Sequence, residues 1–298
     1  MNREFIFNEA KREAFLSEYV KKNGADGVSV IGRSILGRDI HCYKIGAGEK
    51  VILLVGAHGA TEYITASALY DLIEFMILKS TRGGGICEIN IEILLQLFTF
   101  MVVPCPNPDG VEMCTGGIAQ TPLYERQMRM NGESLDFSDW QANARGVDLN
   151  RNYSAGFLEY KKGVEGAAGI SAGKSGFCGE YPESEPESRS IGNLLRICAP
   201  FALMSFRTGG GRISAYPGDT RTTRIAARLA DSVGYKVHSS ADDDAYGSLS
   251  LYASEVLRIP SFCVELAVDK KRGERENSSL RALYDTVRKL AILLGKNV

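Results

Sequence analysis

Val51-Ile-Leu-Leu-Val55 is a short, continuous run of apolar residues bounded by residues that favour turns. Such a run is typical of a strand that is buried on both faces of a sheet. Residues 65–78 carry apolar residues three and four positions apart, which predicts a helix. Further strands are predicted over 28–35, 39–45, 89–95, 98–103, 203–206 and 261–266, and further helices over 8–22, 222–233 and 278–294. Because strands alternate with helices, we expect an α/β sheet covered by helices on both faces.

Two long segments, 107–146 and 153–186, lack clear periodicity. Long connections in a compact domain are usually functional or disordered. In an α/β sheet they gather at the carboxyl ends of the strands, where ligands bind. The sequence shows no internal repeat and no interdomain linker, so we predict a single domain over residues 1–298.

The composition excludes several classes of protein. Apolar residues make up 44% of the chain and charged residues 24%, which is ordinary for a soluble globular protein. A formal net charge of −1 argues against a partner such as nucleic acid or an anionic membrane. The start of the chain lacks the apolar core of a signal peptide, and none of the seven cysteines are spaced as C-x-x-C. We therefore expect a cytoplasmic protein with reduced thiols.

Four segments carry polar residues in a characteristic order. They are Gly59-Ala-Thr-Glu62, Val103-Pro-Cys-Pro-Asn107-Pro-Asp-Gly110, Trp140-Gln-Ala-Asn-Ala-Arg145-Gly-Val-Asp148-Leu-Asn150-Arg151-Asn152-Tyr153 and Ile259-Pro-Ser-Phe-Cys-Val-Glu265-Leu266. This ordered set resembles the zinc carboxypeptidases over roughly residues 28 to 295. Within that family the chain is most similar to the bacterial γ-D-glutamyl-diaminopimelate peptidases, which cut cell-wall stem peptides. The resemblance implies a carboxypeptidase-like domain with a mixed central sheet and helices on both faces.

The resemblance also implies three zinc ligands, of which this chain keeps one. The first zinc histidine of the family falls on Gly59, the zinc glutamate on Glu62, and the second histidine on Arg207. His58 lies four residues before Glu62, so it is a candidate for a shifted ligand, although we expect it to replace an apolar residue. A catalytic zinc ion needs three protein ligands. We therefore expect no cofactor, or zinc only if the site is rearranged.

Other functional positions of the family are retained. The resemblance places the residues that bind the substrate carboxylate and polarise its carbonyl at Arg145, Asn150 and Arg151, and the general base at Glu265. Tyr252 falls in a substrate-contacting loop, although the loop lacks the acidic and tryptophan residues expected of the diaminopimelate branch. Arg145 and Arg151 could together bind a carboxylate through charge-assisted hydrogen bonds. The alternative is that these side chains only tie down loops.

Three functions remain open at this point. The leading hypothesis is a catalytically impaired relative that binds peptides, such as cell-wall stem peptides, through the retained carboxylate site. The second is an active metallocarboxypeptidase with a rearranged metal site, and the third is a structural or regulatory partner with a degenerate cleft. We expect a peptide or peptidoglycan fragment as partner. Because two facing carboxylates are costly, we also predict that Arg207 pairs with Glu62, Glu265 or both.

Overall fold

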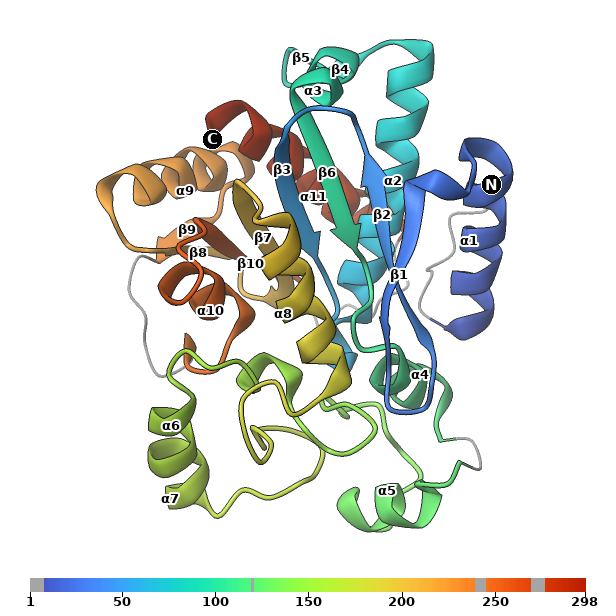
Figure 1. The fold of residues 1–298 in the computed structure, drawn as a ribbon, viewed down its shortest axis with the longest axis vertical. Helices are drawn as coiled ribbons and strands as arrows, with labels where there is room; N and C mark the ends of the chain where they lie inside the picture. Colours follow the sequence, from blue (N-terminus) through green and yellow to red (C-terminus); the bar gives the residue numbers. More distant parts are fainter. Residues whose placement is uncertain (1–7, 119–120, 239–244, 269–276) are drawn as a thin grey trace.

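The computed structural model describes residues 8–118, 121–238, 245–268 and 277–298, and the statements below concern these residues. They form an eight-stranded sheet (Figure 1). The strand order is β1 (Val28–Arg33), β2 (Asp39–Ile45), β6 (Phe98–Val103), β3 (Lys50–Val55), β7 (Ala202–Gly209), β10 (Ser261–Ala267), β8 (Arg212–Tyr216) and β9 (Lys236–His238).

The sheet is mixed, with a parallel centre. Strands β6, β3, β7 and β10 run parallel to one another, whereas β2 pairs with β6 and β8 pairs with β10 in the antiparallel sense. The carboxyl ends of the four central strands therefore lie along one edge of the sheet. This arrangement places the residues that follow β3, β7 and β10 close together.

Helices cover both faces of the sheet. One face packs against α1 (Glu9–Asn23), α2 (Tyr63–Arg82), α9 (Thr220–Val233) and α11 (Asn277–Asn297), and the other against α8 (Pro186–Cys198) and α10 (Leu249–Glu255). Figure 1 shows α8 and α10 in front of the sheet and α2 and α11 behind it.

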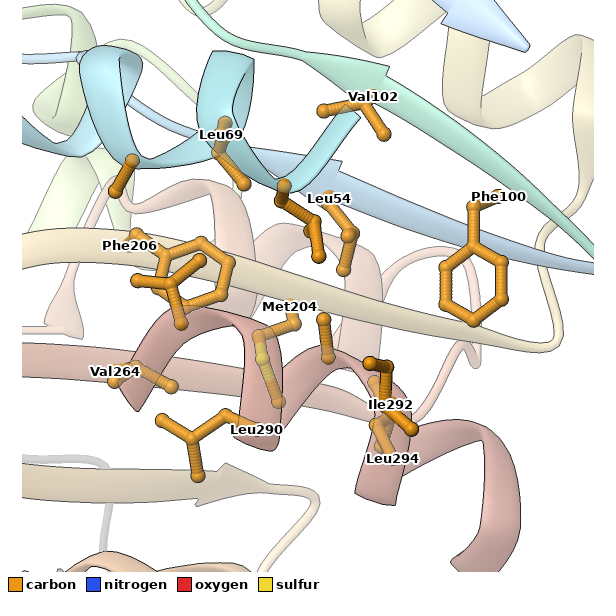
Figure 2. Packing of buried hydrophobic residues seen from close by; sticks show 14 of the residues in the cluster. Leu54, Leu69, Phe100, Val102, Met204, Phe206, Val264, Leu290, Ile292 and Leu294 are labelled. Atoms are coloured by element: carbon orange, nitrogen blue, oxygen red, sulfur yellow. The ribbon is translucent and has the colours of Figure 1, made fainter. Parts of the chain in front are cut away.

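Strand β3 shows why both layers are needed. Successive side chains of a strand point to opposite faces. Leu54 accordingly joins the core under α2 and α11, while Leu53 and Val55 join the core under α8 and α10. In Figure 2, Leu54 and its neighbours in the sheet lie between Leu69 of α2 and Leu290 of α11. The apolar run that predicted a strand buried on both faces is confirmed.

One predicted strand is wrong. Residues 89–95 contain only the short strand β5 (Ile89–Asn90), which pairs with β4 (Gly85–Ile86), and then the helix α3 (Ile91–Leu97). The Asn90 side chain accepts a hydrogen bond from the Ile93 amide at 3.3 Å, and an asparagine cap of this kind starts a helix. The apolar positions in the segment therefore follow the period of a helix.

The long aperiodic segments contain only short elements. These are α4 (Pro108–Gly116), α5 (Tyr124–Met130), α6 (Phe157–Tyr160) and α7 (Gly166–Ala168). Figure 1 shows α4 to α7 at the end of the molecule toward which β3 and β6 point. Within the described ranges, no helix is both long and apolar enough to cross a membrane.

Candidate functional site: an ion-paired cleft at the end of the sheet

Glu62 lies in a short turn of helix, Ala60–Glu62, that follows the carboxyl end of β3. The carboxylate is almost fully buried and accepts a hydrogen bond from the Gly59 amide, with 3.1 Å between Gly59 N and Glu62 Oε2. The Thr65 hydroxyl donates to the Glu62 carbonyl at 2.8 Å and accepts from the Ala57 amide, also at 2.8 Å. These bonds fix the turn, so Glu62 points into the sheet edge with little freedom.

Arg207, near the end of β7, forms an ion pair with Glu62. Its Nε donates to Glu62 Oε1 at 3.3 Å, and 31% of the Arg207 side chain remains exposed. Burial raises the pKa of Glu62, and the charge of Arg207 opposes that effect. The predicted pairing of Arg207 with Glu62 is therefore confirmed.

Glu265, near the end of β10, pairs with a different arginine. Arg212 Nη2 lies 2.6 Å from Glu265 Oε1. Arg207, Glu265 and Arg212 occupy opposing positions on the adjacent strands β7, β10 and β8. Directly opposed residues point to the same face of a sheet. The strands thus present a row of alternating charge: Arg207, Glu265 and Arg212.

A small polar pocket lies along this row. Its volume is about 20 Å³, and its lining includes Asn150, Arg207, Arg212, Ser250, Cys263 and Glu265. Asn150 belongs to the Leu149–Arg151 turn, and its Oδ1 accepts from the Leu249 amide at 3.3 Å. The structure therefore brings together three of the predicted positions, Asn150, Arg207 and Glu265.

Arg145 is held by a carboxylate that sequence reasoning did not select. Its Nε and Nη2 donate to the two oxygens of the buried Glu185, each at 3.0 Å. Asn143 donates to Glu185 at 2.8 Å and to Glu187 at 3.3 Å. Burial raises the pKa of the Glu187 carboxyl to about 8. Arg145 is thus oriented by an interior polar network beneath the cleft.

Arg151 and Tyr252 differ in their contacts and in their burial. The Arg151 guanidinium lies 4.7 Å from the Tyr160 ring centre, and its Nη1 donates to the Tyr246 carbonyl at 3.1 Å. Tyr252 is only 2% exposed and stacks on Tyr153 with 5.5 Å between ring centres. Its hydroxyl accepts from Arg196. Tyr252 therefore lies in the core, and the substrate contact expected for it stays a prediction.

Gly59 faces the side chain of Gln141. A Cβ atom on Gly59 would lie 1.7 Å from Gln141 Nε2, which no pair of atoms tolerates. Gln141 Nε2 donates to Glu62 Oε1 at 3.4 Å, and Gln141 Oε1 accepts from the Thr61 hydroxyl. The space beside Gly59 is therefore filled by the Gln141 side-chain amide, which is hydrogen-bonded to both Glu62 and Thr61.

His58 lies behind the cleft and contacts Tyr153. Its Nε2 is 2.8 Å from the Tyr153 hydroxyl, and the ring is 4% exposed. Burial, followed by the charge of Arg207, lowers the pKa of His58 to about 3, so the ring is neutral near pH 7. In the described ranges, no three or more His, Cys, Asp or Glu side chains cluster closely enough to hold a metal ion.

Comparison with known proteins identifies the family. A sequence profile described as zinc carboxypeptidase matches residues 18–275 of the chain. The chain belongs to the zinc carboxypeptidase family. The structure also resembles bovine thrombin-activatable fibrinolysis inhibitor, with a TM-score of 0.73, 18% identity, and coverage of 99% of this chain and 97% of that one. The predicted α/β carboxypeptidase fold is confirmed.

Relatives within the family include bacterial enzymes. Gamma-D-glutamyl-L-diamino acid endopeptidase 1 of Lysinibacillus sphaericus is 28% identical over 243 residues, which cover 79% of this chain and 59% of that protein. This chain therefore spans about three fifths of that relative. The murein-tripeptide amidase of Escherichia coli O157 shares the fold with a TM-score of 0.53 and 19% identity, covering 88% of this chain and 92% of that one.

Sequence reasoning missed three residues of this carboxypeptidase-family cleft. Gln141 and Glu185 lie within segments that carry the family resemblance, 140–153 and the acidic segment 182–187, but nothing in their spacing shows that they bond to Glu62 and Arg145. Arg212 lies on β8, a strand that was not predicted. Only the pairing of β8 with β10 places Arg212 opposite Glu265.

Proposed function

We propose that this carboxypeptidase-family protein binds the carboxyl ends of peptides, such as cell-wall stem peptides, without a catalytic zinc ion. The observation that carries the proposal is the ion pair between Arg207 and the buried Glu62. Arg207 and Gly59 stand at the positions where the family resemblance places the zinc histidines. The family resemblance places carboxylate binding at Asn150, which lines the pocket, and at Arg145 and Arg151, which lie nearby in the chain.

The donor set does not fit a zinc ion. A catalytic zinc ion takes three nitrogen, sulfur or oxygen ligands and leaves one position open. Glu62 could supply one ligand, but it already accepts from Gly59 and Arg207. A guanidinium stays protonated and offers only N–H donors, so Arg207 cannot ligate a metal and would repel one.

Without a bound metal, the cleft has no evident source of hydroxide. Zinc lowers the pKa of its bound water from about 15.7 to about 7, which raises the hydroxide available at neutral pH by a factor on the order of 10⁸. Glu265 stands at the general-base position, yet Arg212 holds its carboxylate at 2.6 Å. We therefore propose that peptide hydrolysis is strongly impaired.

The peptide class follows from the relatives. One is named a γ-D-glutamyl-L-diamino acid endopeptidase and one structural neighbour a murein-tripeptide amidase. A ligand with a free carboxylate also suits the cleft, because Asn150 lines the pocket with an amide and Arg151, the next residue in the chain, supplies a cation. We propose that a stem-peptide fragment is the ligand.

Calorimetry in the presence of a chelator tests this function. The probe is a γ-D-glutamyl-diaminopimelate peptide with a free carboxyl end, and chromatography of the same samples follows cleavage. We expect binding without turnover. Asn150→Ala should weaken binding about tenfold, the value of one hydrogen bond to a charged group. The exposed Asn193, on α8, provides the matched control Asn193→Ala.

Two outcomes would redirect the proposal. Turnover that stops with chelator and with His58→Ala would favour an active peptidase with a rearranged metal site. This reading draws on the proximity of His58 to the site, because the Arg207 charge lowers the pKa of its buried ring. Neither binding nor turnover would contradict the proposal and leave a structural or regulatory role for a degenerate cleft.

A further inference from the structure

Arg207 is bonded to the protein at one edge only. Its Nε donates to Glu62, and no described residue accepts a hydrogen bond from Nη1 or Nη2. Arg145, by contrast, engages Glu185 with both Nε and Nη2. The outer edge of a guanidinium carries two parallel N–H groups, which match the two oxygens of a carboxylate. Glu62 thus holds the Arg207 guanidinium at Nε, and the edge formed by Nη1 and Nη2 is left to bind a carboxylate in a bidentate manner.

The charges around Arg207 bear on the binding of an added anion. Arg207 and Arg212 supply two positive charges along the row, and the two carboxylates that they contact, Glu62 and Glu265, balance them. Asp148 adds a further negative charge near Arg207 and Glu62, so a ligand carboxylate is favoured by direct contact with the Arg207 guanidinium and not by the charge of the wider surrounding. Without Arg207, the Glu62 carboxylate would repel the ligand. The Arg207 guanidinium, bonded to Glu62 through Nε, compensates that negative charge.

The size of the pocket sets what can enter it. A volume of about 20 Å³ holds about one water molecule. A carboxylate oxygen fits that space, whereas a peptide side chain does not. The remainder of a ligand, including its other carboxylate, must therefore lie outside the pocket, on the side of the Leu149–Arg151 turn, whose Asn150 lines the pocket.

We propose that Arg207 binds a second carboxylate of the ligand, so that the cleft selects dicarboxylates over monocarboxylates. This inference rests on the proposed function, which assigns the terminal carboxylate to the retained site at Asn150 and Arg151. A carboxylate forms charge-assisted hydrogen bonds with Arg207 that are roughly twice as strong as those of a neutral peptide carbonyl. The ligand class is a peptide or small acid with two carboxylates, one of them at the position of Arg207.

Two matched series of acids test the proposal with the full chain. Succinate, glutarate and adipate carry two carboxylates, and butyrate, pentanoate and hexanoate are the monocarboxylates of equal length. Competition calorimetry against the stem peptide, in chelator, should show at least one dicarboxylate binding about tenfold tighter than its monocarboxylate partner, as expected for one added charged hydrogen-bonded pair. Arg207→Gln should remove this preference.

Two further variants keep the test decisive. Because Arg207→Gln leaves Glu62 buried without its cation, the double variant Arg207→Gln, Glu62→Gln replaces the ion pair by two amides and should also lose the preference. Arg33→Gln removes a charge from an exposed arginine on β1 and should keep it. Equal binding of both series by the wild type, or a preference that survives in the folded Arg207 variants, would overturn the inference alone. If neither series nor the peptide binds, the proposed function fails with it.

Discussion

At the scale of single residues, Gln141 determines whether a side chain can be accommodated at position 59. A side chain on Gly59 would collide with the Gln141 amide, which is also bonded to Thr61 and Glu62. Gln141 thus fills the space beside Gly59, a position where the family resemblance places a zinc histidine. We expect that a histidine at position 59 would require Gln141 to give up both bonds.

The first prediction follows from this contact. Gly59→His with Arg207→His should bind zinc weakly, because the new imidazole displaces Gln141. Adding Gln141→Ala should tighten zinc binding at least tenfold by removing the obstacle while keeping the same ligands. Calorimetric zinc titration measures both variants. Equal affinities for the two would show that Gln141 does not obstruct the site.

A second prediction concerns the buried carboxyl of Glu187. Its pKa in the folded protein is raised from the ordinary value of 4.5 to about 8, chiefly by burial. The folded state therefore holds a proton that the unfolded state releases between these values, and the free energy of unfolding should fall as pH rises from about 4.5 to about 8. Urea unfolding at several pH values should show a smaller fall for Glu187→Gln.

The comparison of the Glu187→Gln variant with wild type isolates this group. The nearby carboxylates of Glu185 and Asp109 raise the pKa of Glu187 further. The Ile35 amide donates a hydrogen bond to Glu187, which lowers that pKa and so opposes the effect of burial. Those neighbours are unchanged in the variant, so only the Glu187 contribution disappears. Parallel pH profiles for the two proteins would mean that Glu187 is ionised in the folded state.

At the scale of elements, caps set where several helices begin. Asp219 precedes α9, and its carboxylate accepts from the Thr222 amide at 2.7 Å. Asp219→Ala should lower the free energy of unfolding by about 1 kcal/mol, the usual cost of a lost cap, whereas Asp219→Asn should retain most of it. Thermal unfolding of both variants checks this. Equal losses would show that the carboxylate acts by charge and not as an acceptor.

The elements also show what the sequence could predict. The apolar runs of β3, β7 and β10 follow directly from burial on both faces, so their positions were predicted. The segment 89–95 was predicted as a strand because its apolar residues are dense, and the cap at Asn90 was overlooked. Strand β8 was missed because Arg212 and Ser214 interrupt its apolar character.

The candidate site also has features that the sequence predicts and features that it does not. The family segments placed Glu62, Arg207 and Glu265 near one sheet edge, and the structure brings them there. Which arginine pairs with which glutamate depends on strand register, which local patterns do not encode. The burial of Tyr252 against Tyr153 likewise depends on how α10 packs, which the sequence position of Tyr252 does not show.

At the scale of the whole molecule, the parallel strands at the sheet centre gather the cleft at one edge. Their carboxyl ends bring Glu62, Arg207 and Glu265 together from segments that are far apart in the chain. The fold of the zinc carboxypeptidase family is therefore retained, while the charge in its cleft is supplied by arginines. A protein of this kind should keep ligand binding and lose metal-dependent chemistry.

The most direct test of this account is the metal content of the purified protein after exposure to zinc and removal of free ion, measured by elemental mass spectrometry. We predict far less than one zinc ion per chain, with no change when Arg207 is replaced by lysine. One tightly held zinc ion per chain would contradict the account, because it would require Glu62 to leave Arg207 and a second ligand set to form around it.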